Sequence, residues 1–274
     1  MHDFASGWKR NYYGKGDVIV YRLNRDGAPP AVFGANVTML LYGDAFWPTY
    51  TTGDNTNLVA TDSMKNFIQR ESINYEGCGL ESYCRFLAEK FLATYPQTEG
   101  VQVRVEEIPY SGDVAFTPAG PDRATAQVEW TRGGVAEARS GIRGFKLLRL
   151  GGSAFHGFVR DQYTTLPDIH NRPLHMWLDL EWTYTRPEAA FAEGLTARVR
   201  ETVLDVFRGF ESGSIQQVIY QTGTKLLADI PEMAEVRLEA NNRTWDTVTE
   251  RGETAGVYTD ARPPYGILGL TLRR

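Results

Sequence analysis

The chain has 274 residues, which is enough for one large domain or for two domains of about 150 residues each. Hydrophobic residues make up 42% and charged residues 23%, a composition that excludes a largely disordered chain. No run of about 18 apolar residues occurs, so we expect no membrane-spanning helix. The net charge of −5 argues against a general nucleic-acid binder, which needs a basic face.

Two cysteines, Cys78 and Cys84, and four scattered histidines match neither a disulfide framework nor a zinc-ligand pattern. We therefore expect two reduced thiols and no bound metal. The first residues lack the basic and apolar stretches of a signal peptide, and the final Leu272-Arg273-Arg274 is not a peroxisomal address. Together these features predict a cytoplasmic location.

The first half of the chain predicts strands, then two helices, then strands again. A helix is expected from about Ser63, capped by the side chains of residues 61–63, and a second helix carries apolar residues at helical spacing. A turn is expected at 25–30 and a surface loop at 113–123. The apolar helix positions are Leu80, Cys84, Leu87 and Phe91. The expected strands are 17–23, 36–42, 101–105, 125–131 and 142–150.

The second half repeats this order. A helix is expected to open at Pro187 and to bury a face that runs from Phe191 to Val206, and Ser214 is expected to cap a further helix over 214–228. The expected strands are 154–159, 176–184, 235–239 and 267–272. This repetition predicts an internal duplication and an α+β fold, in which helices cover one face of each antiparallel sheet. A second copy or another subunit would then cover the bare faces.

Five short segments carry polar residues where a ligand could bind. Each has an ordinary explanation when taken singly, such as a solvated lysine, a helix cap or a salt-bridged turn. The segments are Tyr13-Gly14-Lys15, 59–63, 155–166, Ser214-Ile215-Gln216 and the polar stretch from Asn241. The chain has no GxGxxG, P-loop, HExxH, GxSxG or CxxC motif, so classical nucleotide, zinc and serine-hydrolase chemistries have little support.

In this order the segments resemble the motifs of urate oxidases (uricases), from about residue 11 to the final strand. The resemblance implies the tunnelling fold, or T-fold, in two tandem domains that we assign to residues 1–147 and 148–274. Each domain would hold an antiparallel sheet of four strands with two helices on one face. Four subunits would close these sheets into a barrel, with the active sites at subunit interfaces.

The resemblance also implies the oxidation of urate by dioxygen and water to 5-hydroxyisourate and hydrogen peroxide, with no cofactor. Urate and dioxygen would be the partners of this homotetramer, and neither nucleic acid nor membrane would be involved. Two alternatives stay open. One is another T-fold enzyme that acts on purines or pterins, among which the cyclohydrolases need zinc ligands. The other is a purine-binding protein without catalytic activity.

Residue by residue, Lys15 and Thr61 match the catalytic pair of the family. A threonine hydroxyl is a poor base, and a neighbouring lysine with a lowered pKa can relay its proton. In the family this pair comes from one subunit and the main binding residues come from its neighbour. The implied binding groups are the stacking ring of Phe155, the planar fork of Arg172, the carboxamide of Gln216, the backbone N–H groups of Asp62 and Ile215, and Asn241 above the ring.

One position departs from the family pattern. The family often has a histidine two residues after the asparagine, where this chain has Arg243. An arginine, with a pKa above about 12, cannot shuttle a proton near neutral pH, so the role of Arg243 at this relay position is open. The neighbouring Asn242 also allows an alignment shifted by one residue.

Overall fold

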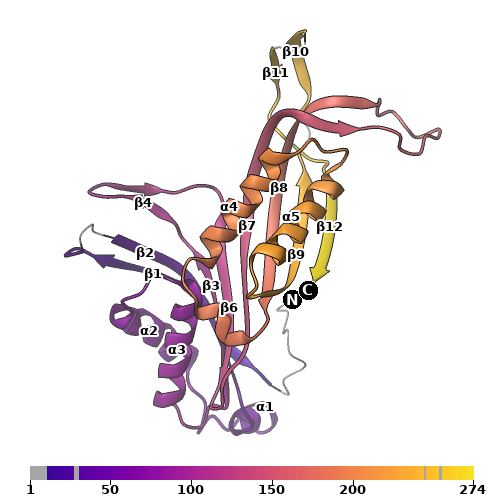
Figure 1. Ribbon diagram of the computed structural model, residues 1–274. Coiled ribbons are helices and arrows are strands. Elements are labelled where there is room, and N and C mark those ends of the chain that lie inside the picture. The colour runs from indigo at the N-terminus through magenta and orange to yellow at the C-terminus, as the bar shows by residue number, and fades with distance from the viewer. Residues whose placement is uncertain (1–10, 28–30, 244, 253–254) are drawn as a thin grey trace. The chain divides into compact units, whose positions relative to one another are not determined.

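A computed structural model describes residues 11–27, 31–243, 245–252 and 255–274 (Figure 1). The chain forms two compact units. Unit 1 comprises Met1–Gly141 and Thr183–Glu193, and unit 2 comprises Ile142–Trp182 and Gly194–Arg274. The long strands β7 (Gly134–Phe155) and β8 (Ile169–Tyr184) each contribute residues to both units. The domain boundary predicted after residue 147 falls inside β7 and stays a prediction.

Unit 1 pairs its main strands in the order β1-β2-β3-β6, followed by the first part of β7. The pairs β1–β2, β2–β3 and β3–β6 are antiparallel. The strands are β1 (Tyr13–Asn24), β2 (Ala31–Tyr42), β3 (Gly100–Glu107) and β6 (Arg123–Thr131), with a small hairpin of β4 (Tyr110–Gly112) and β5 (Phe116–Pro118). The helices are α1 (Trp47–Thr51), α2 (Thr61–Glu71) and α3 (Leu80–Thr94), with 3-10 turns at Asp44–Phe46, Ser72–Asn74 and Pro187–Phe191.

The core of unit 1 forms where α3 packs on β3 and β6. The apolar face predicted for α3 is confirmed, because Leu80, Cys84, Leu87 and Phe91 are all buried. On β1, Val18 and Val20 point into the core, and the alternating side chains Ile19 and Tyr21 are about half exposed. The second face of β1 therefore leaves apolar side chains partly exposed, although Tyr21 contacts Tyr110 edge-on.

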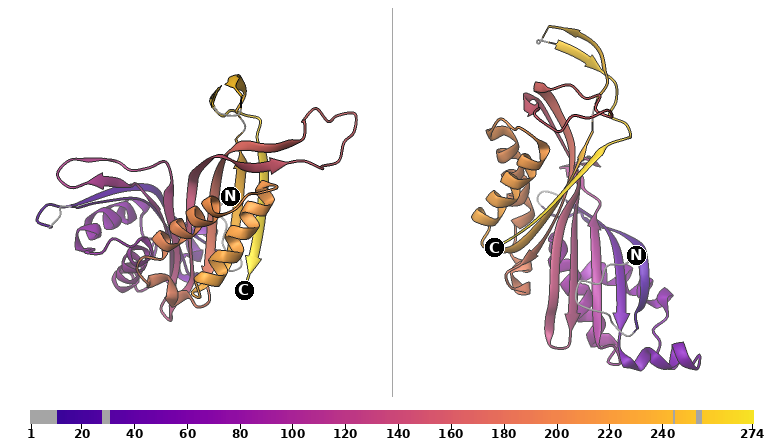
Figure 2. Two further views of the ribbon diagram at one scale, coloured as in Figure 1. Left: turned by 45° about the horizontal axis from the view of Figure 1, so that its top comes forward. Right: turned by 90° about the vertical axis from the view of Figure 1, so that its right-hand side faces the viewer.

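Unit 2 pairs the rest of its strands in the order β7-β8-β9-β12, and β9–β12 is antiparallel. Its helices α4 (Leu195–Gly209) and α5 (Ile215–Asp229) lie side by side on one face of this sheet (Figures 1 and 2). The remaining strands are β9 (Met233–Asn242), β12 (Gly266–Arg273) and the separate hairpin β10 (Thr247–Arg251) and β11 (Ala255–Tyr258). The antiparallel sheets with helices on one face agree with the α+β fold expected from the sequence.

Several expected boundaries were wrong. Helix α2 begins at Thr61 rather than near Ser63, so the three residues meant to cap it form its first turn. Strand β7 ends at Phe155, which excludes residues 156–159 from any strand. Pro187 opens a 3-10 turn rather than the predicted helix. Helix α4 begins separately at Leu195, because the preceding Gly194 adopts a left-handed backbone conformation, with φ 78°, that interrupts the helix.

Two further segments complete the comparison. The stretch 113–123, expected to be a loop, contains β5 of the small hairpin. In the turn expected at 25–30, residues 28–30 lie outside the described residues. Among the described helices, none is long and apolar enough to cross a membrane.

Candidate active site

A cavity of about 540 Å³ lies in unit 2, where the end of β7, the start of β8, the start of α5 and the end of β9 meet. Its lining brings together five of the residues singled out from the sequence. They are Phe155, Arg172, Ile215, Gln216 and Arg243. Segments that are far apart in the chain, from Phe155 on β7 to Leu268 on β12, therefore contribute to one site.

Arg172 is one of two arginines in the cavity lining, with Arg243, and Glu250 adds an opposite charge. The Arg172 side chain is partly buried, and this burial lowers the pKa of its guanidinium. The Nε atom is buried and has no hydrogen-bond partner among the described residues, and the guanidinium carbon lies 6.0 Å from the ring centre of Phe155. A buried donor without a partner is costly unless a ligand accepts its hydrogen bond. The pair therefore suits a flat anion that can stack on the ring and accept from the guanidinium.

The first turn of α5 forms a second wall. The Ser214 side chain caps the helix by accepting a hydrogen bond from the backbone N–H of Gln217 at 3.1 Å, as the sequence predicted. Ile215 is buried at the helix start, and Gln216 is exposed on the cavity lining. A helix start presents free N–H groups and the positive end of the helix dipole, so this wall also favours an anion.

The two asparagines of β9 differ in their positions. Leu238 and Ala240 are buried on the helix-covered face of the strand, and strand alternation gives Asn242 the same face. Asn242 lines the cavity and Asn241 does not. Asn241 pairs with Ile267 of the neighbouring strand β12. The structure thus places Asn242 at the cavity, rather than the predicted Asn241.

Arg243 lines the cavity, but aromatic rings hold its guanidinium. The guanidinium carbon lies 4.0 Å from the ring centre of Trp177 and 3.8 Å from that of Tyr265. Its backbone N–H donates to the carbonyl oxygen of His175 at 3.1 Å. This double stacking gives Arg243 a packing role that its position in the sequence did not indicate.

His175 also lines the cavity, and sequence reasoning missed it. Burial lowers the pKa of His175, the positive charges of Lys146 and Arg243 lower it further, and the charge of Asp260 partly opposes them. The imidazole therefore releases its proton more readily than a free histidine side chain does. A single histidine in a strand carries no local signal, because the charges that set its pKa come from distant parts of the sequence.

Lys15 and Thr61 belong to unit 1. Lys15 lies on β1 beside a bulge, since the pairing with β2 shifts register between Lys15 and Val18, and Asp17 adopts a φ of 56°. Bulges commonly re-aim side chains next to functional sites. Thr61 and Asp62 are exposed in the first turn of α2, a helix that packs against β1.

Charge links these two parts of unit 1. The pKa of Asp62 is lowered mainly by its hydrogen bond with Lys65, at 2.6 Å, and in part by the charge of Lys15. Lys15 thus lies within electrostatic range of the first turn of α2. Elsewhere in the described chain, no three His, Cys, Asp or Glu side chains are grouped closely enough to hold a metal ion.

The two units define a tandem T-fold protein, and the cavity in unit 2 brings together Phe155, Arg172 and Gln216. The uricase family model matches residues 11–128 and 138–268. The uricase of Haloferax volcanii is 35% identical over 96% of this chain and 97% of its own length. The uric acid degradation bifunctional protein of Bacillus subtilis is also 35% identical, and this chain spans about 60% of its length.

A crystal structure of urate oxidase from Bacillus sp. TB-90 superposes with a TM-score of 0.86 at 34% identity, covering 96% of this chain and all of that one. A uricase from Bacillus fastidious superposes equally well, at 33% identity and over 97% of this chain. The chain therefore belongs to the uricase family. The T-fold that the sequence motifs implied is confirmed.

Proposed function

We propose that this protein is a urate oxidase, which converts urate, dioxygen and water to 5-hydroxyisourate and hydrogen peroxide. The observation that carries the proposal is the partly buried Arg172, with its unpartnered Nε, beside the ring of Phe155 in a cavity that also holds Gln216. Membership of the uricase family supports the same reaction.

Each binding group matches a feature of urate, which is flat, anionic and edged with carbonyl and N–H groups. The planar guanidinium of Arg172 donates two parallel hydrogen bonds to a carbonyl and an adjacent ring nitrogen. The carboxamide of Gln216 both donates and accepts, so it reads the opposite edge. Phe155 stacks on the ring face. The backbone N–H groups of Ile215 and Asp62 donate further hydrogen bonds from two helix starts.

We assign the amide above the ring to Asn242 rather than to Asn241. The support is that Asn242 lines the cavity with Arg172 and Gln216, and Asn241 faces away from that lining. The Asn242 amide would hold dioxygen or water over the stacked ring.

In the proposed chemistry, Thr61 and Lys15 remove a proton from urate and leave an electron-rich dianion. The dianion is the reductant and dioxygen is the oxidant, so the reaction needs no cofactor. Water then adds to the oxidised ring, and the two electrons leave on hydrogen peroxide. The support for this pairing is that Lys15 and the exposed hydroxyl of Thr61 lie on β1 and α2, two elements of unit 1 that pack against each other.

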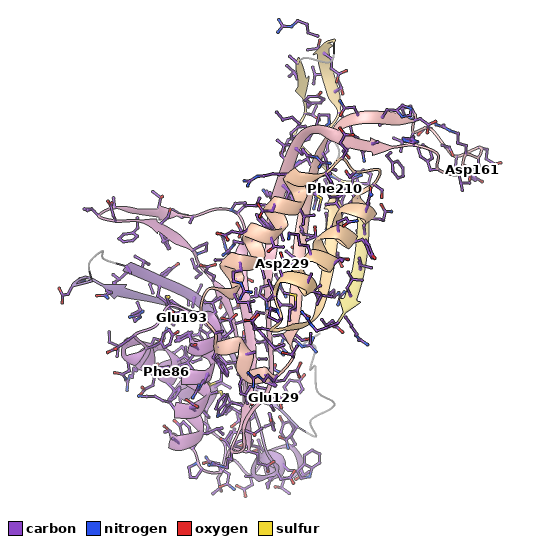
Figure 3. The ribbon with its side chains drawn as sticks, in the orientation of Figure 1. Phe86, Glu129, Asp161, Glu193, Phe210 and Asp229 are labelled. Atoms are coloured by element: carbon purple, nitrogen blue, oxygen red, sulfur yellow. The ribbon has the colours of Figure 1, made fainter. Side chains whose placement is uncertain are left out.

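We further propose a homotetramer in which Lys15 and Thr61 of one subunit complete the cavity of its neighbour. Exposed apolar side chains support an oligomer, since monomers rarely leave such patches uncovered. Val159 is 87% exposed and Tyr163 is 81% exposed, both near Asp161 on the arm that projects between β7 and β8 (Figure 3). A cytoplasmic location is also part of the proposal, because the free thiols Cys78 and Cys84 suit a reducing compartment.

The function is tested by following the ultraviolet absorbance of urate in air-saturated buffer, with hydrogen peroxide measured in parallel. We expect urate to disappear and peroxide to form in equal amounts, with and without a chelator. Arg172→Ala is the control for activity at this cavity. Intact urate after incubation with the unmodified protein would refute the proposal, and loss of activity with the chelator would refute its cofactor-free form.

The shared site is tested by co-expressing two variants of reduced activity, Thr61→Ala and Arg172→Ala. If each site combines residues from two subunits, mixed tetramers contain some sites with both native residues and regain activity. Each variant expressed alone is the control. If a site is built within one subunit, no mixed tetramer contains a complete site, and co-expression restores nothing.

A further inference from the structure

Arg149 on β7 links this strand to the segment that runs from the end of α4 to Ser212. One terminal nitrogen, Nη1, donates to the carbonyl oxygens of Phe207 at 3.0 Å and Phe210 at 2.5 Å, at the end of α4 (Figure 3). The other, Nη2, donates to the carbonyl oxygen of Gly152 at 2.7 Å and to the hydroxyl of Ser212 at 2.8 Å. Burial lowers the pKa of this guanidinium, so its charge is partly withdrawn from water. Hydrogen bonds to a charged group are about twice as strong as neutral ones.

The segment held by Arg149 leads directly into the cavity wall. Ser212 is buried. Its N–H donates to the carbonyl oxygen of Gly152 at 2.9 Å, and its own carbonyl oxygen accepts from the N–H of Ala154 at 2.7 Å. Two residues after Ser212, Ser214 caps α5, and Ile215 and Gln216 follow. These hydrogen bonds of Arg149, Gly152 and Ser212 therefore fix the start of α5, the helix that carries two proposed binding residues.

The residues that form the other walls of the cavity follow the same hydrogen-bonded positions. Phe155 follows Ala154 on β7, one residue beyond the bond to Ser212. The N–H of Gly152 donates to Asn171 Oδ1 at 2.8 Å, and Asn171 precedes Arg172 on β8. The stacking ring, the guanidinium fork and the carboxamide thus all lie within a few residues of the hydrogen bonds around Gly152 and Ser212.

We propose that Arg149 is a positioning residue for ligand binding, which sets the spacing between Phe155, Arg172 and Gln216. The inference rests on the proposed function, because urate is the ligand whose binding it sets. Arg149 does not line the cavity, so it acts through the Ser212 segment. Binding groups that are held in place beforehand bind a ligand more tightly, because the ligand does not have to order them, so loosening this segment should weaken binding measurably.

Unit 1 offers a matched control. Arg132 donates through its Nη2 to three carbonyl oxygens at and beyond the end of α3, those of Leu92 at 3.4 Å, Pro96 at 2.7 Å and Thr98 at 3.2 Å. It therefore closes a helix end as Arg149 does. The segment that it holds leads into the core strand β3 and to no residue of the candidate site. Removing either arginine should lower stability, but only Arg149 should affect urate.

The experiment compares Arg149→Gln, Arg149→Lys and Arg132→Gln with the unmodified protein. Urate affinity is measured under nitrogen, where oxidation cannot proceed, and KM, kcat and the unfolding temperature are measured separately. We expect Arg149→Gln to weaken urate binding at least about tenfold and to raise KM by more than it lowers kcat. Arg149→Lys should recover part of the affinity, since an ammonium keeps the charge but not the planar fork. Arg132→Gln should unfold at a lower temperature with unchanged affinity.

Equal affinities in Arg149→Gln and the unmodified protein would overturn the inference and leave Arg149 with a structural role only. If Arg149→Gln does not fold, Ser212→Ala decides instead, because it removes one acceptor and leaves the charge in place. A several-fold weaker binding of urate by Ser212→Ala supports the inference, and unchanged binding overturns it. If the unmodified protein itself binds no urate, the proposed function fails, and that result is separate from any difference between variants.

Discussion

The two units each build a sheet with helices packed on it, but helix α2 of unit 1 and helix α5 of unit 2 begin differently. Helix α2 of unit 1 follows Ala60, has no side-chain cap, and exposes a hydroxyl and a carboxylate in its first turn near a lysine. Helix α5 of unit 2 is capped by Ser214 and opens with a buried Ile215 beside the cavity. Under the proposed function, unit 1 supplies proton transfer and unit 2 supplies recognition of urate.

The largest expected effect tests the role of unit 1. Thr61→Ala and Lys15→Met should each slow turnover by about 10²–10⁴-fold, because a proton-transfer group acts in the transition state. Urate affinity under nitrogen should change much less. Steady-state kinetics and anaerobic titration measure the two quantities. Normal turnover in either variant would remove that residue from the proposed pair.

The second prediction looks for chemistry within unit 2. Asn242→Ala should slow turnover by about 10²–10³-fold, the usual cost of removing one hydrogen-bond donor that acts on the reacting groups. Asn241→Ala is the matched control, one residue away on the opposite face of β9, and should leave turnover unchanged. Rate measurements with both variants decide which asparagine acts. The reverse result would return the assignment to Asn241.

The third prediction tests the recognition role of unit 2. Arg172→Ala should weaken urate binding by about 10–100-fold, since a lost hydrogen bond to a charged group costs about 1.5–3 kcal/mol. Arg172→Lys should restore little of the affinity, because an ammonium cannot donate two parallel hydrogen bonds in a plane. Anaerobic titration with urate gives both affinities. A lysine variant with near-normal affinity would show that the arginine supplies charge alone.

The parts of the fold predicted well from the sequence are those with an apolar period. The face of α3 from Leu80 to Phe91 is buried as its spacing required. The start of α2 was predicted too late, because Thr61, Asp62 and Ser63 all have side chains that favour the N-cap, and the backbone places that cap at Ala60. Boundaries of this kind depend on dihedral angles that residue type does not fix.

The residues of the candidate site likewise fall into those that sequence motifs indicate and those that only the folded structure brings to the site. Phe155, Arg172 and Gln216 stand in motifs and were found from them, and the structure brings them to one cavity. Two contributions had no local signal. The choice between Asn241 and Asn242 depends on the register of β9. The environment of His175 depends on Lys146 of β7 and on Arg243, which follows the end of β9.

The smallest predicted effect is on the pH dependence of folding stability, which one titratable group in each unit should change in opposite directions. In unit 1, Glu81 accepts a hydrogen bond from the Ser140 hydroxyl at 2.5 Å, and burial raises the pKa of Glu81 above its ordinary 4.5. The folded state then holds this proton to a higher pH than the unfolded state does. Its contribution to stability is present in full below pH 4.5 and is lost as the pH rises through the folded pKa.

In unit 2, the pKa of His175 is lowered from 6.5, so the unfolded state binds the proton more readily. Its contribution to stability is present above pH 6.5 and is lost as the pH falls through the folded pKa. Denaturant unfolding between about pH 4.5 and 8 measures both effects. Glu81→Gln should flatten the loss of stability on the alkaline side of pH 4.5, and His175→Asn should flatten the loss on the acid side of pH 6.5. If the unfolding free energy of both variants changes with pH as it does in the unmodified protein, Glu81 and His175 do not contribute to the pH dependence of stability.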